Sequence, residues 1–438
     1  MFKSKKVAGV LCCALAVACA GVSVSFAGCS KSNTHIYYMN PEYMGSEAYL
    51  EIVGDPSISE DDYDSYYNDK LSSEFKSLSY DASVLLSTLD RDLSTSLTDT
   101  ELESLHPTEE NTDEDTSTSV TYCVYRFNQA SAGETVKIDE YTYDLLGIAL
   151  DMYDATDGYY NPAVYYSVIA YGFGEQEETD ADEVSAYPSS AEELPSAAEV
   201  AAYTELAGHF GEIKLSTGTD EKGSTAYYVT KPEYTVSVNG ETLAMKIDLG
   251  GIGKGYATDK ISALIDEYNT AYPGDFKYGY FTFGSSSVAV KQYYGDEENG
   301  YYTIGLTNPR LSTNAFAQFT GRNLVLSTSG DYEQYYRIDG VTYCHIINPK
   351  TGMPINTDQN DAISSNVVTI TIAGGSAAED DAYTTALMAM GGLQAINYIN
   401  ENLADRQFVM VINFNGRYAV VSNIDSLEIV SGIEGELE

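Results

Sequence analysis

Four glycines crowd the segment Lys246–Asp259, which reads Lys-Ile-Asp-Leu-Gly-Gly-Ile-Gly-Lys-Gly-Tyr-Ala-Thr-Asp. The apolar pattern before them predicts a strand over Ala244–Asp248 that places Asp248 at its end. Glycine allows a tight turn and a close approach of a ligand to the backbone, and we expect a helix over Tyr256–Tyr268 to follow directly. The free amides of that helix and Lys254 would then face the same point, as in a phosphate-binding loop.

This glycine segment matches neither of the common phosphate-binding motifs. No GxGxxG occurs in it, and no Ser or Thr follows the Gly-Lys pair. By itself the segment is equally compatible with a simple glycine-rich turn between a strand and a helix.

A second group of motifs surrounds one histidine. The chain reads Ser-Thr-Ser-Gly-Asp-Tyr-Glu-Gln-Tyr-Tyr over Ser327–Tyr336 and Cys-His-Ile-Ile-Asn-Pro-Lys-Thr-Gly-Met-Pro over Cys344–Pro354. We expect His345 on a strand, ahead of an Asn-Pro-Lys-Thr-Gly turn, where an imidazole can act as an acid or base or orient a ligand. A strand histidine that only bonds backbone groups is the simpler alternative.

A third candidate site lies on the helix expected over Ala377–Met390. Asp381 and Thr385 are four residues apart, so they share one helix face. A carboxylate and a hydroxyl, joined by a backbone carbonyl from elsewhere, make a sparse oxygen site that suits Mg²⁺ when water and a substrate phosphate complete it. The helix dipole alone also favours acidic residues in a first turn, which is the alternative explanation.

The N-terminus predicts export. Three lysines within the first six residues precede an apolar run, Val7–Ala27, and small residues then lead to Cys29. This order is typical of a bacterial export signal. The last residues resemble a lipobox, in which the signal is cut before a cysteine that carries a diacylglyceryl group, although Phe26 stands where Leu is usual.

We therefore expect a signal peptide over residues 1–28 and a lipid-anchored tether over 29–40, on the outer face of the cytoplasmic membrane. An uncleaved anchor is the alternative, since about 20 apolar residues suffice to span a bilayer. A catalytic domain is expected over 41–430, with acidic loops near 98–118 and 175–193.

Export leaves few cysteines in the mature chain. Three of the six lie in the signal and Cys29 is the expected lipid carrier, so Cys123 and Cys344 remain. Two thiols make neither a disulfide framework nor a zinc site of the usual spacing. They either form one bridge or are small core residues.

The chain is strongly acidic. Its formal net charge is −43, and loss of the three signal lysines would make it −46. This charge excludes nucleic acid as a partner bound through phosphates, which requires basic patches. An anionic ligand would need a local cation, a helix N-terminus or a metal ion to offset the field.

Helices and strands are interspersed without a strict βαβ alternation, and no repeat of fixed period occurs. This order predicts an α+β (mixed α/β) fold, a single two-lobed catalytic body with the ligand cleft between the lobes. The expected helices are Leu71–Asp92, the helix within Val136–Thr156, Ala197–His209, Tyr256–Tyr268, Ala377–Met390 and Leu393–Asn400. The expected strands are Ala48–Val53, Tyr227–Thr230, Tyr234–Val238, Ala244–Asp248, Gly279–Phe283, Val288–Gln292, Tyr302–Leu306, Asn323–Ser327, Val367–Ile372, Phe408–Asn413 and Tyr418–Val421.

Taken together and in order, these motifs resemble one family, the bacterial FAD:protein FMN transferases of the ApbE type. The resemblance is carried by Asp248–Tyr256, Thr328–Tyr332, His345–Gly352 and Asp380–Leu387. Further blocks with counterparts in the family are Met44-Gly45, Tyr125–Asn128, Thr156–Pro162 and Ile304–Pro309. The similarity spans roughly residues 40 to 425.

The resemblance implies an enzyme that moves FMN from FAD to a Thr or Ser hydroxyl of an acceptor flavoprotein and releases AMP. The acceptor is expected in an extracytoplasmic electron-transfer system. The implied FAD-binding residues are Met44, Tyr159, Tyr160, Asn161, Asp248, Lys254, His345 and Ile347. The implied Mg²⁺ ligands are Gly251 through its carbonyl, Asp381 and Thr385, and the implied catalytic residues are His345 and Asp381.

Several positions depart from the family pattern. Gly284-Ser285-Ser286 stands where Gly-Gly-Asp is usual, Asn161 and Asn348 replace aspartates, and Gly253 replaces alanine. Two alternative functions remain open at this point. One is an FAD pyrophosphatase that uses water as the acceptor, and the other is a non-catalytic FAD-binding lipoprotein.

Overall fold

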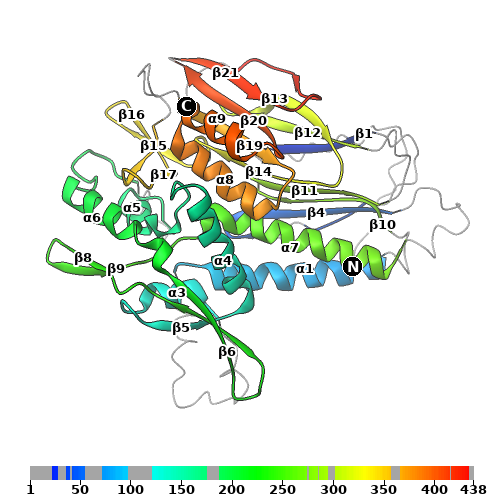
Figure 1. Ribbon diagram of the computed structural model, residues 1–438. Helices are drawn as coiled ribbons and strands as arrows, with labels where there is room; N and C mark the ends of the chain where they lie inside the picture. Colours follow the sequence, from blue (N-terminus) through cyan, green and yellow to red (C-terminus); the bar gives the residue numbers. More distant parts are fainter. Residues whose placement is uncertain are drawn as a thin grey trace, which may run out of the picture.

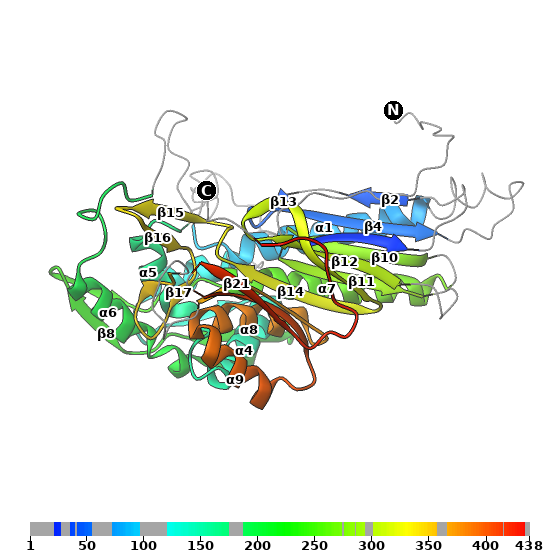
Figure 2. The same cartoon turned by 90° about the horizontal axis from the view of Figure 1, so that it is seen from above.

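The computed structural model describes residues 22–27, 36–39, 42–54, 72–96, 121–174, 187–273, 276–284, 286–293, 301–356, 366–414 and 416–433. Figures 1 and 2 show two β-sheets and a layer of helices beside a smaller mixed region. This confirms the predicted mixed α/β class.

A nine-stranded sheet forms the centre of the described structure. Its strands follow the order β2-β4-β10-β11-β14-β19-β20-β21, with β3 paired to β4, and all these pairs are antiparallel. Side chains alternate along a strand, so β10 sends Tyr280 to one face of the sheet and Phe281 to the other. The strands are β2 (Ile36–Met39), β3 (Glu42–Tyr43), β4 (Ser46–Gly54), β10 (Phe276–Phe283), β11 (Ser287–Gln292), β14 (Leu324–Gly330), β19 (Asn366–Ala373), β20 (Gln407–Phe414) and β21 (Arg417–Ser422).

The two faces of this sheet are covered differently. One face packs on a four-stranded sheet of order β1-β12-β13-β22, through a core that includes Val288, Ile304 and Phe319. These strands are β1 (Val22–Ala27), β12 (Tyr301–Asn308), β13 (Leu311–Gly321) and β22 (Glu428–Ile429). The other face is covered by α1 (Ser72–Leu93), α7 (Gly250–Ala271), α8 (Ala377–Met390) and α9 (Gly392–Asn402).

The second lobe lies beside the helical layer (Figure 1). It contains the sheet β5-β7-β6 and the hairpin β8-β9. On α4, Leu145, Ala149 and Met152 are buried as predicted and join the same core as α1 and α7. The elements are α3 (Cys123–Gln129), β5 (Thr135–Ile138), α4 (Glu140–Ala155), α5 (Tyr165–Ala170), α6 (Ala197–Ala207), β6 (Lys214–Thr219), β7 (Thr225–Thr230), β8 (Thr235–Val238) and β9 (Glu241–Ala244).

Two small hairpins join the lobes. They are β15 (Tyr335–Ile338) with β16 (Val341–Cys344), and β17 (Ile347–Asn348) with β18 (Met353–Pro354). Tyr336 and Ile347 from these hairpins pack on Tyr171 and Phe173, which follow α5. The lobes therefore share apolar contacts through these hairpins.

Two predicted elements are wrong at the glycine segment. The expected strand Ala244–Asp248 ends as β9 at Ala244, and residues 245–249 are neither strand nor helix. The expected loop of glycines is instead the start of α7, which begins at Gly250 rather than at Tyr256. Glycine is unfavourable inside a helix. A prediction based on propensity therefore placed the helix start after the last of the four glycines, too late in the sequence.

Two smaller differences from the predicted elements remain. The eleven-residue strand β13 was not predicted, because polar residues interrupt its apolar pattern. His345 lies in a bend between β16 and β17 rather than on a strand.

Several predictions lie wholly or mainly outside the described residues, including the acidic loop 98–118, Cys29 and most of the signal 1–28. The signal peptide stays a prediction, and its removal would take β1 away from its partner β12. Cys123 and Cys344 are free and buried, so of the two alternatives left open they are core residues and form no bridge. None of the described helices combines the length and apolarity that crossing a membrane requires.

Candidate functional site

A cleft of about 320 Å³ lies between the lobes and collects the residues predicted for the site. One wall comes from the second lobe and the segment before α7, and the other from α7, α8 and the loops around His345. The predicted residues that line it are Met44, Tyr159, Tyr160, Asn161, Asp248, Gly251, Lys254, His345, Ile347, Asp381 and Thr385. The fold thus brings together motifs that are more than 300 residues apart in sequence.

Asp248 is held where the two lobes meet. Its backbone N–H donates to the Pro162 carbonyl at 2.9 Å, and its Oδ1 accepts from the Gly250 N–H at 2.7 Å. Just before it, both backbone groups of Ile247 bond the side-chain amide of Asn128, at 2.8 and 2.9 Å. These hydrogen bonds hold Asp248 in place, and not the strand that the sequence predicted.

The glycines of α7 allow this helix to pack closely against α8. A Cβ on Gly255 would collide with the Ala377 carbonyl oxygen and lie 2.8 Å from Asp381 Cβ. A Cβ on Gly251 would lie 3.2 Å from Thr385 Oγ1. The glycines therefore let the backbone at the start of α7 approach both predicted metal-binding side chains of α8.

Asp381 is a buried carboxylate at this contact. It is 5% exposed, and its Oδ2 accepts the Gly255 N–H at 3.0 Å. Burial raises the pKa of Asp381 to about 7, while the Gly255 hydrogen bond and the positive charge of Lys254 oppose the rise. A carboxylate in this setting gains from a cation bound beside it.

His345 is oriented by the loop that precedes β15. Its backbone N–H donates to the Gln334 carbonyl at 3.1 Å, and its Nδ1 lies 3.2 Å from the same oxygen. Desolvation lowers the pKa of His345, partly offset by the carboxylate of Glu333. A neutral ring whose Nδ1–H donates to Gln334 leaves Nε2 as an acceptor, the form that a general base requires.

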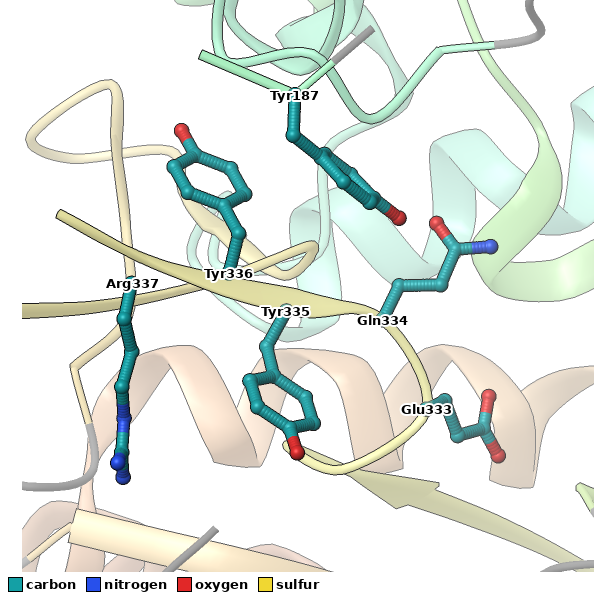
Figure 3. A pocket seen from close by; sticks show the side chains of 6 residues that line it. All are labelled: Tyr187, Glu333, Gln334, Tyr335, Tyr336 and Arg337. Atoms are coloured by element: carbon teal, nitrogen blue, oxygen red, sulfur yellow. The ribbon is translucent and has the colours of Figure 1, made fainter. Parts of the chain in front are cut away.

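The sequence reasoning missed other residues that line the cleft. Those that can contact a ligand through polar groups include Ser286, Thr328, Ser329, Glu333 and Gln334, and Phe173 adds an aromatic ring. Glu333 and Gln334 follow the Thr-Ser-Gly-Asp-Tyr motif directly and are drawn in Figure 3. Their position directly after this motif is the sequence signal that could have identified them.

A buried ion pair anchors the start of this loop. Arg310 and Asp331 are joined by two hydrogen bonds of 2.8 and 2.9 Å, and both side chains are fully buried. Arg310 Nε also donates to the Tyr418 hydroxyl, and the Asp331 N–H donates to the Val368 carbonyl. The loop that carries Glu333 and Gln334 is thus tied to the central sheet.

The departures from the family pattern have structural explanations in two cases. Asn161 donates to the Ala207 carbonyl at 3.0 Å and accepts from the Ala163 N–H at 2.9 Å. Asn348 donates to the Ala389 carbonyl at 3.0 Å. An aspartate could not donate these bonds. Ser286 lies in the cleft at the position where the family's additional carboxylate is usual.

The charges of the cleft are uneven. Asp248, Glu333 and Asp381 line it, and Lys254 is the one Lys or Arg among its described lining residues. No group of three or more His, Cys, Asp and Glu side chains in the described part of the chain is arranged to hold a metal ion. The predicted Mg²⁺ ligands do not form a cluster of this kind, because they comprise one carboxylate, Asp381, together with the Thr385 hydroxyl and a backbone carbonyl.

Comparison with known proteins identifies the family. A family model described as ApbE family matches residues 77–410. The FAD:protein FMN transferase of Buchnera aphidicola (Schizaphis graminum) is 25% identical over 283 residues, 64% of this chain and 70% of that protein. The enzyme of the same name from Escherichia coli is 30% identical over 146 residues, 33% of this chain and 37% of that protein.

Solved structures share the fold. The flavin transferase ApbE from Vibrio cholerae has a TM-score of 0.58 and 20% identity, covering 90% of this chain and 98% of that one. The flavinyl transferase ApbE of Pseudomonas stutzeri has a TM-score of 0.59 and 18% identity, covering 90% and 96%. The family model matches most of the chain, and so the chain belongs to the ApbE family.

Proposed function

We propose that this chain transfers FMN from FAD to a Thr or Ser hydroxyl of an acceptor flavoprotein, in a Mg²⁺-dependent reaction that releases AMP. The prediction of an enzyme, an FAD:protein FMN transferase, is confirmed by the shared name of its curated relatives. The magnesium ion, the acceptor hydroxyl and the roles of individual residues belong to the proposal. The observation that carries it is the single cleft that joins Lys254, the start of α7, Asp381, Thr385 and His345.

The residues at the α7–α8 contact fit a magnesium ion. Asp381, Thr385 and the Gly251 carbonyl are hard oxygen donors, and water and phosphate oxygens would complete the site. The buried carboxylate of Asp381, with its raised pKa, is the group in this set that a cation would stabilise. The bound ion would neutralise charge on the pyrophosphate as AMP leaves.

The remaining cleft residues have complementary tasks. Lys254 and the amides at the start of α7 hold the pyrophosphate, because both present positive charge to an anion. Met44, Tyr159, Tyr160 and Ile347 supply apolar surface for the flavin. His345 then remains as the residue that would act on the acceptor hydroxyl.

The transfer is one displacement at phosphorus. His345 Nε2 removes the proton from the acceptor hydroxyl, and the acceptor oxygen forms a bond to the FMN phosphorus. The bond from that phosphorus to the oxygen shared with AMP breaks, and AMP leaves with the electron pair. A water molecule in place of the hydroxyl would give free FMN.

The cellular setting is also part of the proposal. The basic and apolar N-terminus supports export, and Cys29 supports a lipid anchor on the outer face of the cytoplasmic membrane. An extracytoplasmic electron-transfer flavoprotein would then be the acceptor.

The test uses residues 30–438 with FAD, Mg²⁺ and the exported proteins of the source cell. In-gel flavin fluorescence and AMP release are followed together. We expect a fluorescent protein band that resists denaturation and AMP formed in step with it. AMP with free FMN and no labelled protein would instead identify a pyrophosphatase, and bound FAD without AMP would contradict both enzymes.

A further inference from the structure

A second hollow of about 450 Å³ adjoins the flavin cleft. It is lined by Tyr187 and by the run from Glu333 to Arg337, as Figure 3 shows. Glu333 and Gln334 line both the hollow and the cleft, so the two spaces share a wall. The other residues of the hollow are not among the described residues that line the cleft.

We propose that this hollow receives the segment of the acceptor protein that carries the modified hydroxyl. The inference rests on the proposed transfer to protein, because a transferase needs a place for a polypeptide beside its nucleotide. That place must lead to the reacting phosphorus, and the shared wall meets this requirement.

The shared wall also holds the proposed base. The Gln334 carbonyl lies 3.1 Å from the His345 backbone nitrogen and 3.2 Å from its Nδ1. A hydroxyl that enters the cleft along Gln334 therefore arrives beside the imidazole. Contacts in the hollow would orient the hydroxyl before the proton is removed.

The hollow has an aromatic lining. Tyr187 and Tyr336 lie on one side of β15, with ring centroids 5.2 Å apart, and Tyr335 points to the other side (Figure 3). Behind them, the ring centroid of Phe173 lies 5.3 Å from that of Tyr336 and 6.5 Å from that of His345. Tyrosine offers contact area and a polar end at low entropic cost, which suits recognition of a polypeptide.

The wall is preformed. The fully buried Arg310–Asp331 pair fixes the chain two residues before Glu333, and β15 is held by β16 through the register Tyr335–Cys344 to Ile338–Val341. A surface that is already ordered loses less entropy when a partner binds. A polypeptide can therefore gain affinity from few contacts here.

A third hollow does not lead to the reacting phosphorus in this way. It lies along α6, where Val200, Thr204 and Met353 are among its lining residues. None of its described lining residues also lines the cleft. A segment bound there would not lead directly to His345.

The test begins with the protein that the wild-type chain labels. A short synthetic peptide centred on its labelled residue is the probe, and labelling is measured against peptide concentration. We expect Tyr187→Ala and Tyr335→Ala each to raise the half-saturating peptide concentration by about tenfold, the effect of losing roughly one buried aromatic contact. FAD affinity, measured by quenching of flavin fluorescence, should stay within about twofold of wild type.

The matched control is Tyr228→Ala, which removes a half-buried tyrosine from β7, a strand that does not line the cleft. It should leave both values unchanged. An unchanged half-saturating concentration in folded Tyr187→Ala and Tyr335→Ala would overturn the inference while leaving the proposed function intact. A parallel loss of FAD affinity would also overturn it, by assigning the hollow to FAD. If the wild-type chain labels no protein, the proposed transfer fails and the inference fails with it.

Discussion

Asp380 and Asp381 are neighbours in sequence and both are buried, yet they face different partners. Burial raises the pKa of each to about 7. Asp380 accepts from Arg406 Nε at 3.2 Å, so its charge is balanced within the chain. Asp381 accepts from the Gly255 backbone N–H and lines the cleft, so the cation that balances it would come with the ligand.

Asp381→Asn should therefore abolish metal-dependent turnover without unfolding the protein. An amide oxygen can still accept the Gly255 N–H, but it no longer supplies a negative charge to Mg²⁺. We expect AMP release to fall by at least about 100-fold, because losing a direct ligand should cost at least as much as losing a residue that only supports one. Asp380→Asn is the matched control. It should lower the melting temperature and leave the half-saturating Mg²⁺ concentration unchanged. Wild-type activity in Asp381→Asn would contradict the metal site.

The same two carboxyls predict how stability depends on pH. In the folded chain they keep their protons up to about pH 7, whereas in the unfolded chain an aspartate loses its proton near about pH 4. The folded state binds more protons between these values, so their contribution to stability is present at low pH and is lost as pH rises from about 4 to about 7.

Mg²⁺ should reverse this loss, because it binds the ionised form of Asp381. We expect Mg²⁺ to raise the melting temperature by about 2–4 °C at pH 8, the size of a change of about 1 kcal/mol, and by less at pH 6. Differential scanning calorimetry with EDTA or Mg²⁺ measures this. The Mg²⁺ effect should disappear in Asp381→Asn, and an equal effect at both pH values would argue against Asp381 as the ligand.

At the scale of elements, the site depends on how closely α7 and α8 approach. Asp259 on α7 accepts three hydrogen bonds from the first turn of α8, from Ser376 Oγ at 2.7 Å and from the Ala377 and Ala378 N–H groups at 2.8 and 3.0 Å. One turn earlier, Gly255 touches α8 directly. The Asp259 carboxylate and the absence of a side chain at Gly255 together set the distance between α7 and Asp381.

Two glycine substitutions on α7 should have opposite effects. In Gly255→Ala the new methyl meets the Ala377 carbonyl and Asp381, so the helices must separate, and we expect destabilisation of about 1–3 kcal/mol with weaker Mg²⁺ binding. In Gly253→Ala the methyl meets only Leu93 at 3.4 Å and Met44 at 3.9 Å, which is ordinary contact. This variant should gain up to about 1 kcal/mol from helix propensity. Urea unfolding compares them, and equal effects of the two would contradict the close-approach explanation.

At the scale of the whole molecule, a very acidic chain binds an anionic substrate. The formal net charge is −43, and Lys254 is the one Lys or Arg among the described residues that line the cleft. The start of α7 and the proposed Mg²⁺ add local positive charge to this lysine. A few local groups would therefore offset the negative charge of the whole chain at the cleft.

Cys29→Ala should change where the protein resides. Without the thiol that carries the lipid, we expect an exported protein to leave the membrane fraction, because the mature chain would keep no acyl chains. Cell fractionation with immunoblotting measures this, and Cys344→Ala is the control because Cys344 is buried in the body of the protein. The mass of the wild-type chain separates the two alternatives: a chain that begins at a lipid-modified Cys29 fits the lipid anchor, and a full-length chain in the membrane would favour the uncleaved anchor.

The sequence alone determined most elements, because apolar periodicity and propensity act over short distances. The helix expected over Ala377–Met390 has those bounds in the structure, and the strands that contain Val288–Gln292 and Phe408–Asn413 lie where predicted. The site residues were predicted through a resemblance of ordered motifs, and the structure places them along one cleft. Only the tertiary structure decided that the glycines of 250–255 begin a helix instead of forming a loop, because that depends on the contact with Ala377 and Asp381. It also decided that Gln334 and His345 share a wall between the cleft and its neighbouring hollow, since neither propensity nor spacing encodes which loops meet across a chain.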